Sequence, residues 1–250
     1  MLAPTLSIII ITLNEQNQLP RLLGDLANQS TQDFEIIHVD SNSSDNTLAV
    51  SWAWAHRFAR YQVIPMTRRG VSLGRNTGAN KARGERLLFL DADTRLSSDF
   101  LACALSDLKI RRLDLGIVPM SAKGLSWRHK TGYAAFNVGI RITAWFFPTA
   151  IGACLFSTPE LHRKIDGFDE ALTLCEDCNY ALKATQMDQT RLGVLTSRFA
   201  FNPRRLDRDG LLHMGLLYLR ANLRRFFYGE LYTNEIPYRF GYANKTTLIK

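Results

Sequence analysis

The chain has 250 residues, of which 46% are hydrophobic, 22% charged and 10% aromatic. These ordinary proportions exclude collagen-like, low-complexity and wholly disordered classes. The net charge of +8 is unevenly placed, because residues 201–250 carry nine Lys and Arg against four Asp and Glu. With its basic excess near one end and no platform of basic and aromatic strand residues, the sequence argues against nucleic-acid binding.

Four scattered cysteines are too few for a disulfide scaffold, and the CxxC pair of Cys175 and Cys178 lacks the second ligand pair of a zinc site. This usage favours a reducing compartment. The first residues, MLAPTLSIIIITLNE, lack the basic start and the cleavage site of a signal peptide. We therefore expect a cytoplasmic protein, and peripheral attachment to the inner face of the membrane stays open.

Four apolar segments rich in β-branched residues or leucine predict buried strands, at residues 6–13, 34–40, 61–66 and 85–93. Helical spacing fills residues 18–28 and 48–61 between them. Strands and helices that alternate at this spacing predict an α/β fold with a parallel sheet. In such sheets ligands bind at the carboxyl ends of the strands.

The rest of the chain reads as an exposed helix at 103–112, a strand near 115–120 and a strongly helical stretch at 210–228. Residues 142–159 carry no charge, but Pro148 and Gly152 interrupt them. A buried strand and turn that line a site are therefore favoured over a membrane span. Along the last helix, Leu-rich positions form one stripe with arginines beside it. Packing on the body of the protein, a homodimer contact and a membrane surface all remain open for it.

Polar side chains end three of the predicted strands: Asn14 with Glu15, then Asp40, then Asp91 with Asp93. Two carboxylates separated by one small residue suit a hard divalent cation that leaves positions open for phosphate oxygens. Residues 70–85 add four glycines and Arg75, which indicates either a phosphate-binding loop or an ordinary helix start. No Walker motif and no GxGxxG follow the first strand, which disfavours P-loop NTPases and dinucleotide dehydrogenases.

The most acidic stretch, residues 165–184, contains Glu176 and Asp177. Acidic residues stabilise the first turn of a helix, so these two can be structural. Alternatively one of the two carboxylates acts as a general base on an incoming hydroxyl.

Together these stretches resemble the family 2 glycosyltransferases, which use nucleotide sugars and have the GT-A fold. The similarity rests on TLNE (12–15), VDSNSSDNT (39–47), GRNTGANKARGERLLFLDADT (74–94) and GFDEALTLCED (167–177), in the family's order. One departure is Asp166, where the family usually has a second glycine. The resemblance implies a Rossmann-like, mostly parallel sheet with helices on both faces and a C-terminal helical segment. It also implies a catalytic domain at 1–200, with a nucleotide-sugar half at 1–100 and an acceptor half at 101–200. A basic extension at 201–250 would pack on it.

The resemblance also implies roles for individual residues. Asp91 and Asp93 match the DXD motif and would hold Mg²⁺ or Mn²⁺, with Asp93 the more direct ligand. Asp177 ends the ED motif and would be the catalytic base, with Glu176 as its substitute. The nucleotide sugar would contact a larger set. Thr12, Asn14 and Glu15 would lie near the nucleoside, and Asp40 would bind the edge of the base, with Ser43 and Asp45 nearby. Arg75 would face the base or the diphosphate, Asp91 the donor, and Arg204 and Arg205 the diphosphate or the acceptor.

The reaction implied is metal-assisted, inverting transfer from a nucleoside-diphosphate sugar to an acceptor hydroxyl on a saccharide or lipid. UDP-linked donors are the commonest expectation, and GDP and dTDP remain open. A sugar-nucleotide-binding module without catalysis is the alternative, and the four acids Asp91, Asp93, Glu176 and Asp177 weigh against it.

Overall fold

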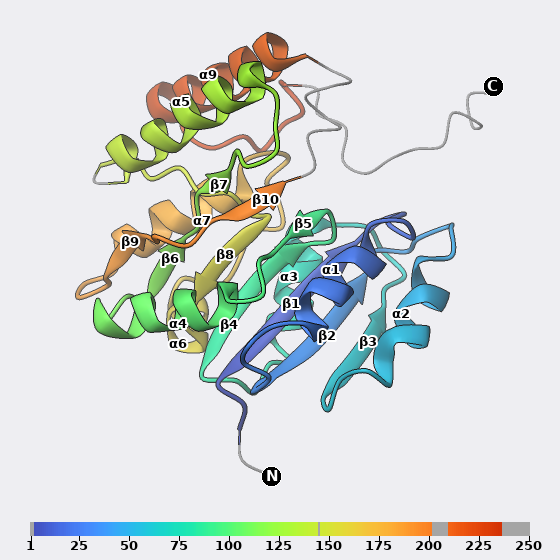
Figure 1. Cartoon of the computed structure of the whole chain (residues 1–250). Helices are drawn as coiled ribbons and strands as arrows, with labels where there is room; N and C mark the ends of the chain where they lie inside the picture. Colours follow the sequence, from blue (N-terminus) through green and yellow to red (C-terminus); the bar gives the residue numbers. More distant parts are fainter. Residues whose placement is uncertain (1–2, 145, 202–209, 237–250) are drawn as a thin grey trace, which may run out of the picture.

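The computed structural model describes residues 3–144, 146–201 and 210–236, and it is built on a seven-stranded sheet with strand order β3-β2-β1-β4-β8-β6-β9 (Figure 1). Its strands are β1 (Leu6–Thr12), β2 (Phe34–Asp40), β3 (Tyr61–Pro65), β4 (Arg86–Asp91), β6 (Leu115–Ile117), β8 (Cys154–Ser157) and β9 (Leu192–Val194). A smaller sheet pairs β5 (Thr94–Arg95), β10 (Phe199–Phe201) and β7 (Met120–Ser121). The predicted mostly parallel sheet is confirmed, since β8 is the strand that runs against its neighbours β4 and β6.

Helices cover both faces of the large sheet. They are α1 (Leu19–Ala27), α2 (Thr47–Ala55), α3 (Val71–Ala79), α4 (Phe100–Ile110), α6 (Pro159–Lys164) and α7 (Glu176–Thr185). Two more helices, α5 (Trp127–Thr143) and α9 (Leu211–Tyr228), lie beyond the sheet at one end of the molecule. Side chains of β1 alternate between two cores: Ile8 and Ile10 join a cluster with α1 and α4, and Ile9 joins the cluster with α6 and α7. This alternation explains the continuous apolar run of a strand that is buried on both faces.

Helix α3 lies unusually close to the sheet because glycines line its inner side. A Cβ atom on Gly78 would come within 2.4 Å of Ile9 Cγ2, and one on Gly74 within 3.2 Å of Ile11 Cγ2. Gly74 and Gly78 therefore serve helix packing. The predicted helix is present and starts at Val71, and phosphate binding at its start, which is compatible with a helix, stays a prediction.

Several boundaries differ from the sequence prediction. The second helix ends at Ala55, well before residue 61. Helix α4 is not simply exposed, because Phe100, Leu101, Ala104 and Leu108 are buried on one side. The uncharged stretch 142–159 holds the end of α5 and the buried strand β8, as expected, while α5 itself has a weak helical pattern that sequence inspection missed.

Helices α5 and α9 lie next to each other at one end of the molecule (Figure 1). Helix α9 packs inward through Met214, Ala221 and Arg225, which are buried. Four of the five residues of the predicted stripe, Leu216, Leu219, Leu223 and Phe226, instead face solvent, so the stripe is not the surface by which this helix packs on the body. The side chain of the fifth, Leu212, is outside what the structure describes. Within the described residues, none of the helices has both the length and the apolarity that crossing a bilayer requires.

Candidate functional site

Three strand ends meet at one edge of the sheet. In the parallel register, Thr12 on β1 pairs with Asp40 on β2, and Ile11 pairs with Asp91 on β4. The polar groups that follow β1, β2 and β4 therefore share the carboxyl edge, where open α/β sheets bind their ligands.

The loops after β1 and β2 are tied together around the buried carboxylate of Asp40. Thr12 Oγ1 and Ser43 Oγ donate to its Oδ1 at 2.8 and 2.6 Å, and the Ser43 amide donates to Oδ2 at 2.8 Å. The Asn14 amide in turn donates to Ser43 Oγ at 2.9 Å. Asn14 has a φ of 59°, a left-handed conformation that asparagine tolerates better than most residues.

Asp45 and Glu15 join the same two loops from their far side. The Asp45 carboxylate accepts hydrogen bonds from the Thr47 amide and hydroxyl, and the Glu15 amide donates to Thr47 Oγ1 at 2.9 Å. The structure thus brings together all six predicted nucleoside residues, Thr12, Asn14, Glu15, Asp40, Ser43 and Asp45.

For Asp40 the geometry argues against the predicted contact with a base. The residue has no exposed surface, and both of its carboxylate oxygens accept hydrogen bonds from the protein. Asp40 therefore fixes the shape of the two loops. Ser43 and Asp45 lie nearer the surface and are only partly buried, although their side chains also make hydrogen bonds within the loops.

A chain of hydrogen bonds continues from Asp40 into the core. The Thr12 hydroxyl gives its one proton to Asp40, so it must accept from His38 Nε2, 2.8 Å away. His38 Nδ1 then accepts from Ser51 Oγ at 2.6 Å. Burial lowers the pKa of His38 to about 4, despite the nearby charge of Asp40, so the imidazole is neutral at physiological pH.

The second part of the site is built around Arg75 on α3. Its guanidinium bridges two carboxylates that are 85 residues apart in sequence, with Nη2 3.1 Å from Asp91 and Nη1 2.7 Å from Glu176. The group is 2% exposed and lies over the ring of Phe168 at 5.1 Å. Arg75 was expected to face the base or the diphosphate, but it is enclosed by protein and instead joins the end of β4 to the start of α7.

Charges in this cluster shift one another's pKa values. Burial opposes the charge on Arg75, yet Asp91, Glu176 and Asp177 together raise its pKa above the ordinary value. The pKa of Glu176 is also raised, because burial and the neighbouring Asp177 outweigh the opposite effect of Arg75. The direct 2.7 Å contact with an always-protonated guanidinium favours an ionised Glu176.

Asp177 stands beside this bridge, half-buried on the first turn of α7. Its Oδ2 accepts the Gly152 amide at 2.7 Å, and its Oδ1 accepts the Cys178 amide at 2.7 Å. Gly152 is required here, since a Cβ atom would come within 2.5 Å of Arg75 Nη2. The loop before β8 therefore holds Asp177 and makes room for Arg75 at the same residue.

The CxxC pair is part of this packing. Cys175 and Cys178 are free and buried where α7 begins. The hydrogen bond with Cys175, together with burial, raises the pKa of Cys178 and disfavours its thiolate. A metal or redox role, which the sequence already disfavoured, gains no support from this environment.

Sequence inspection missed the residue that places the acidic loop. Asn76, next to Arg75, donates to the Phe168 carbonyl at 2.8 Å and accepts the Phe168 amide at 2.9 Å. This pairing fixes Phe168 under the Arg75 guanidinium. Asp166, the departure from the family pattern, has a φ of 55°, which explains why glycine is common there. The sequence signal that could have identified Asn76 as part of the site was its position directly after Arg75.

The expected metal ligands lie where β4 ends. Asp91 is partly exposed, and Asp93 is buried in the following turn. No group of three or more His, Cys, Asp or Glu side chains among the described residues forms a metal cage. Two carboxylates at this edge fit a hard cation whose other ligands come from substrate phosphates. The predicted Arg204 and Arg205 lie outside the described residues.

Comparison with known sequences agrees with this geometry. The sequence model described as Glycosyl transferase family 2 matches residues 7–144. A PGL/p-HBAD biosynthesis glycosyltransferase of Mycobacterium bovis (strain BCG / Pasteur 1173P2) is 41% identical over 104 residues, which is 41% of this chain and 41% of that protein. The cholesterol galactosyltransferase of Borreliella burgdorferi is 28% identical over 109 residues, 44% of this chain and 30% of that protein. The matched stretch thus spans less than half of each relative.

Solved structures share the fold. Residues 1–349 of S. aureus TarS in complex with UDP-GlcNAc superpose with a TM-score of 0.62 and 21% identity, covering 79% of this chain and 57% of that one. Mannosyltransferase PcManGT from Pyrobaculum calidifontis, in complex with GDP-Man and Mn²⁺, gives 0.63 and 22%, covering 88% and 65%. The fold of this chain is therefore the GT-A fold, as expected from the sequence.

Proposed function

The chain belongs to glycosyl transferase family 2, and from that premise we propose that it transfers a sugar from a nucleoside-diphosphate sugar to an acceptor hydroxyl, with inversion at the anomeric carbon. One observation carries the proposal. A single buried arginine, Arg75, joins Asp91 at the metal-binding motif to Glu176 at the start of α7, directly beside Asp177. An arrangement that couples the donor end of the sheet to a second acidic group suits a displacement with donor and base on opposite sides of one sugar carbon.

We assign distinct roles to the two acids of α7. Glu176 is a positioning residue, because it is buried and its carboxylate is occupied by Arg75. Asp177 is the proposed catalytic base, since it is only half-buried and is held by two backbone amides. It takes the proton of the acceptor hydroxyl as that oxygen bonds to the anomeric carbon and the bond to the nucleoside diphosphate breaks.

The donor would lie along the carboxyl edge of β1, β2 and β4. Its nucleoside would contact the loops held by Asp40, through Asn14, Ser43 and Asp45. Asp91 and Asp93 would hold Mg²⁺ or Mn²⁺, which would neutralise charge on the departing diphosphate. The Mn²⁺ and GDP-Man bound to the similar mannosyltransferase support this assignment.

Names of the relatives bear on donor and acceptor. TarS was crystallised with UDP-GlcNAc and PcManGT with GDP-Man, so UDP and GDP sugars are the first donors to test. The name of the cholesterol galactosyltransferase supports a lipid hydroxyl beside saccharides as an acceptor class for this chain.

The test is Asp177→Asn, assayed by release of nucleoside diphosphate from UDP and GDP sugars, with water or added alcohols as acceptor. Because the amide keeps a hydrogen-bond acceptor for Gly152 but cannot accept the acceptor's proton, we expect turnover to fall by roughly 10²–10⁴-fold with donor affinity unchanged. Asp188→Asn, in the exposed turn that follows α7, is the matched control and should behave like the wild type. Full activity of Asp177→Asn would remove the base from this residue. A wild type that binds nucleotides without ever turning over would favour the non-catalytic binding module.

A further inference from the structure

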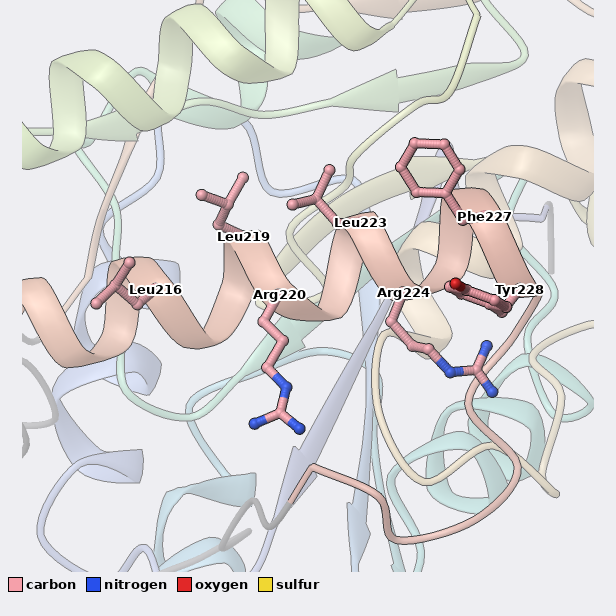
Figure 2. A pocket seen from close by; sticks show the side chains of 7 residues that line it. All are labelled: Leu216, Leu219, Arg220, Leu223, Arg224, Phe227 and Tyr228. Carbon is pink, nitrogen blue, oxygen red and sulfur yellow. The ribbon is translucent and has the colours of Figure 1, made fainter.

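Helix α9 presents a continuous apolar surface to solvent. Its outward side chains are large, and they are about half to three-quarters exposed: Leu216, Leu219, Leu223, Phe226 and Phe227. In Figure 2, Leu219, Leu223 and Phe227 project together from one side of the helix, and Arg220 and Arg224 project together from another. A shallow groove along the helix is lined by Leu216, Leu219, Arg220, Leu223, Arg224, Phe227 and Tyr228. An exposed apolar surface of this kind marks an interaction site rather than ordinary surface scatter.

The neighbouring helix α5 also exposes large apolar side chains to solvent. Its buried side is formed by Tyr133, Asn137 and Ile140, while Trp127, Val138 and Ile142 stand exposed on other sides. The two helices lie against each other, with the rings of Phe136 and Tyr218 6.2 Å apart. We call the exposed sides of these two helices the basic apolar face. It comprises the apolar side chains of Trp127, Val138, Ile142, Leu216, Leu219, Leu223, Phe226 and Phe227 and the cations beside them.

The charge of this face has one sign. Neither α5 nor α9 contains a single Asp or Glu, whereas together they carry two histidines, one lysine and five arginines. Two of the arginines are matched by acids from the following segment, since Arg224 pairs with Glu235 and Arg225 with Glu230. Among the described residues, Arg128, Lys130 and Arg141 have no carboxylate within ion-pair distance, and Arg220 is near enough to Glu235 to help lower the pKa of that carboxyl.

We propose that the basic apolar face docks on the surface of an anionic lipid bilayer. Leucine and aromatic side chains would enter the boundary between headgroups and acyl chains, and the arginines and the lysine would meet lipid phosphates, as in amphipathic helices that lie in the membrane plane. Charge decides against a second copy of this chain as the occupant. Two such faces in contact would bring arginine against arginine, and neither helix offers an acid to offset the repulsion.

The face adjoins the candidate site. Phe147, in the loop that leads to Gly152, contacts Phe226 on α9 with ring centroids 5.4 Å apart. On the buried side of α9, the Arg225 guanidinium lies 4.9 Å from the centroid of the same Phe147 ring. Docking would therefore place the lipid surface beside the loop that holds Asp177. The docking itself does not depend on the proposed activity and is tested without any sugar nucleotide.

The experiment is sedimentation of the full chain with vesicles of phosphatidylcholine containing phosphatidylglycerol, and with vesicles of phosphatidylcholine alone. We expect binding to the anionic vesicles that weakens with salt, and at most weak binding to the neutral ones. Leu219→Glu combined with Leu223→Glu should weaken binding by at least about tenfold, because the variant loses apolar contact and gains repulsion. Arg220→Gln should weaken it about fivefold through the loss of one charge.

The control is Ile110→Glu, which adds one negative charge, half the change made by the double variant, at an apolar side chain that is exposed on α4. It should bind like the wild type. Circular dichroism and the thermal midpoint should be unchanged in every variant, since all these positions are exposed or partly exposed. Equal binding by wild type and the Leu219→Glu, Leu223→Glu variant would overturn the proposal, as would equal loss in Ile110→Glu. A wild-type dimer in sedimentation equilibrium that the double variant makes monomeric would assign the face to a second copy instead.

Discussion

The candidate site and the basic apolar face differ in which leucine and arginine side chains they bury. At the site, the leucines and isoleucines of β1, β4 and α1 are buried apart from the partly buried Ile11, and Arg75 is buried among carboxylates. On α9, Leu216, Leu219 and Leu223 are exposed to solvent. The residues buried there include an arginine, Arg225, which makes two hydrogen bonds to the Glu230 carboxylate at 2.7 and 2.8 Å.

This difference indicates where each region finds its interaction partners, within the protein or outside it. A buried charge is tolerated only when opposite charges and hydrogen bonds surround it. Both arginines have carboxylate partners, although Arg75 Nε makes no hydrogen bond within the described part of the chain. Exposed leucines have no such internal partner, so the second region is complete only against another apolar phase. The first region is organised around groups that come from the protein itself.

Removal of Arg75 should give the largest change. Arg75→Met leaves Glu176 buried without its counter-charge, so we expect the free energy of unfolding to fall by about 3–5 kcal/mol in urea denaturation. Arg75→Met combined with Glu176→Met should recover part of that loss, because no buried glutamate is then left without a counter-charge and only the partly exposed Asp91 loses its partner. A loss below about 1 kcal/mol for the single variant would mean that the bridge does not hold β4 and α7 together.

Glycine-to-alanine substitutions should have opposite signs in the two regions. Gly78→Ala forces a Cβ atom against Ile9 and should cost about 1–3 kcal/mol of unfolding free energy. On α9 no atom lies within 4 Å of a Cβ placed on Gly215, so Gly215→Ala should gain about 0.5–1 kcal/mol. The same sign for both changes would contradict the contrast between a tightly packed and an open region.

Stability should fall in mild acid because of two histidines in the sheet region. Burial lowers the pKa of His38 and of His162 from 6.5 to about 4. The unfolded chain therefore binds these protons first as the pH falls from 6.5 to 4, which stabilises the unfolded state. We expect the unfolding free energy to drop by up to about 1.4 kcal/mol per pH unit for each histidine. His38→Gln should lower this slope by about half, and an unchanged slope in that variant would refute the assignment.

Sequence reasoning located the sheet edge because continuous apolar runs and the polar groups after them depend on local pattern. The same reasoning could not show that Asp40 turns inward or that Arg75 is enclosed, since both depend on partners far away in the chain, Thr12 for one and Glu176 for the other. The glycines of α3 were ambiguous for the same reason. Their role appears only when Ile9 and Ile11 are placed beneath them.

Helix α9 marks the other limit of sequence reasoning. Its stripe of leucines was correctly placed on a helix, but a stripe does not say whether it faces the protein or the solvent. The buried positions Met214, Ala221 and Arg225 decide that question, and an arginine in a packing surface is not an apolar signal. Helix α5 was missed because its apolar residues are spread around the helix.

The most direct test of the account is calorimetric titration of UDP, GDP and their sugars into the wild type and Asp93→Asn, each with and without Mn²⁺. The account predicts that one nucleotide binds the wild type tightly only when Mn²⁺ is present, and that Asp93→Asn loses this metal-dependent affinity while its thermal midpoint without ligand stays close to that of the wild type. Affinity that is the same with and without metal, and the same in both proteins, would contradict the central claim that the edge of β1, β2 and β4 is a metal-dependent nucleotide-sugar site.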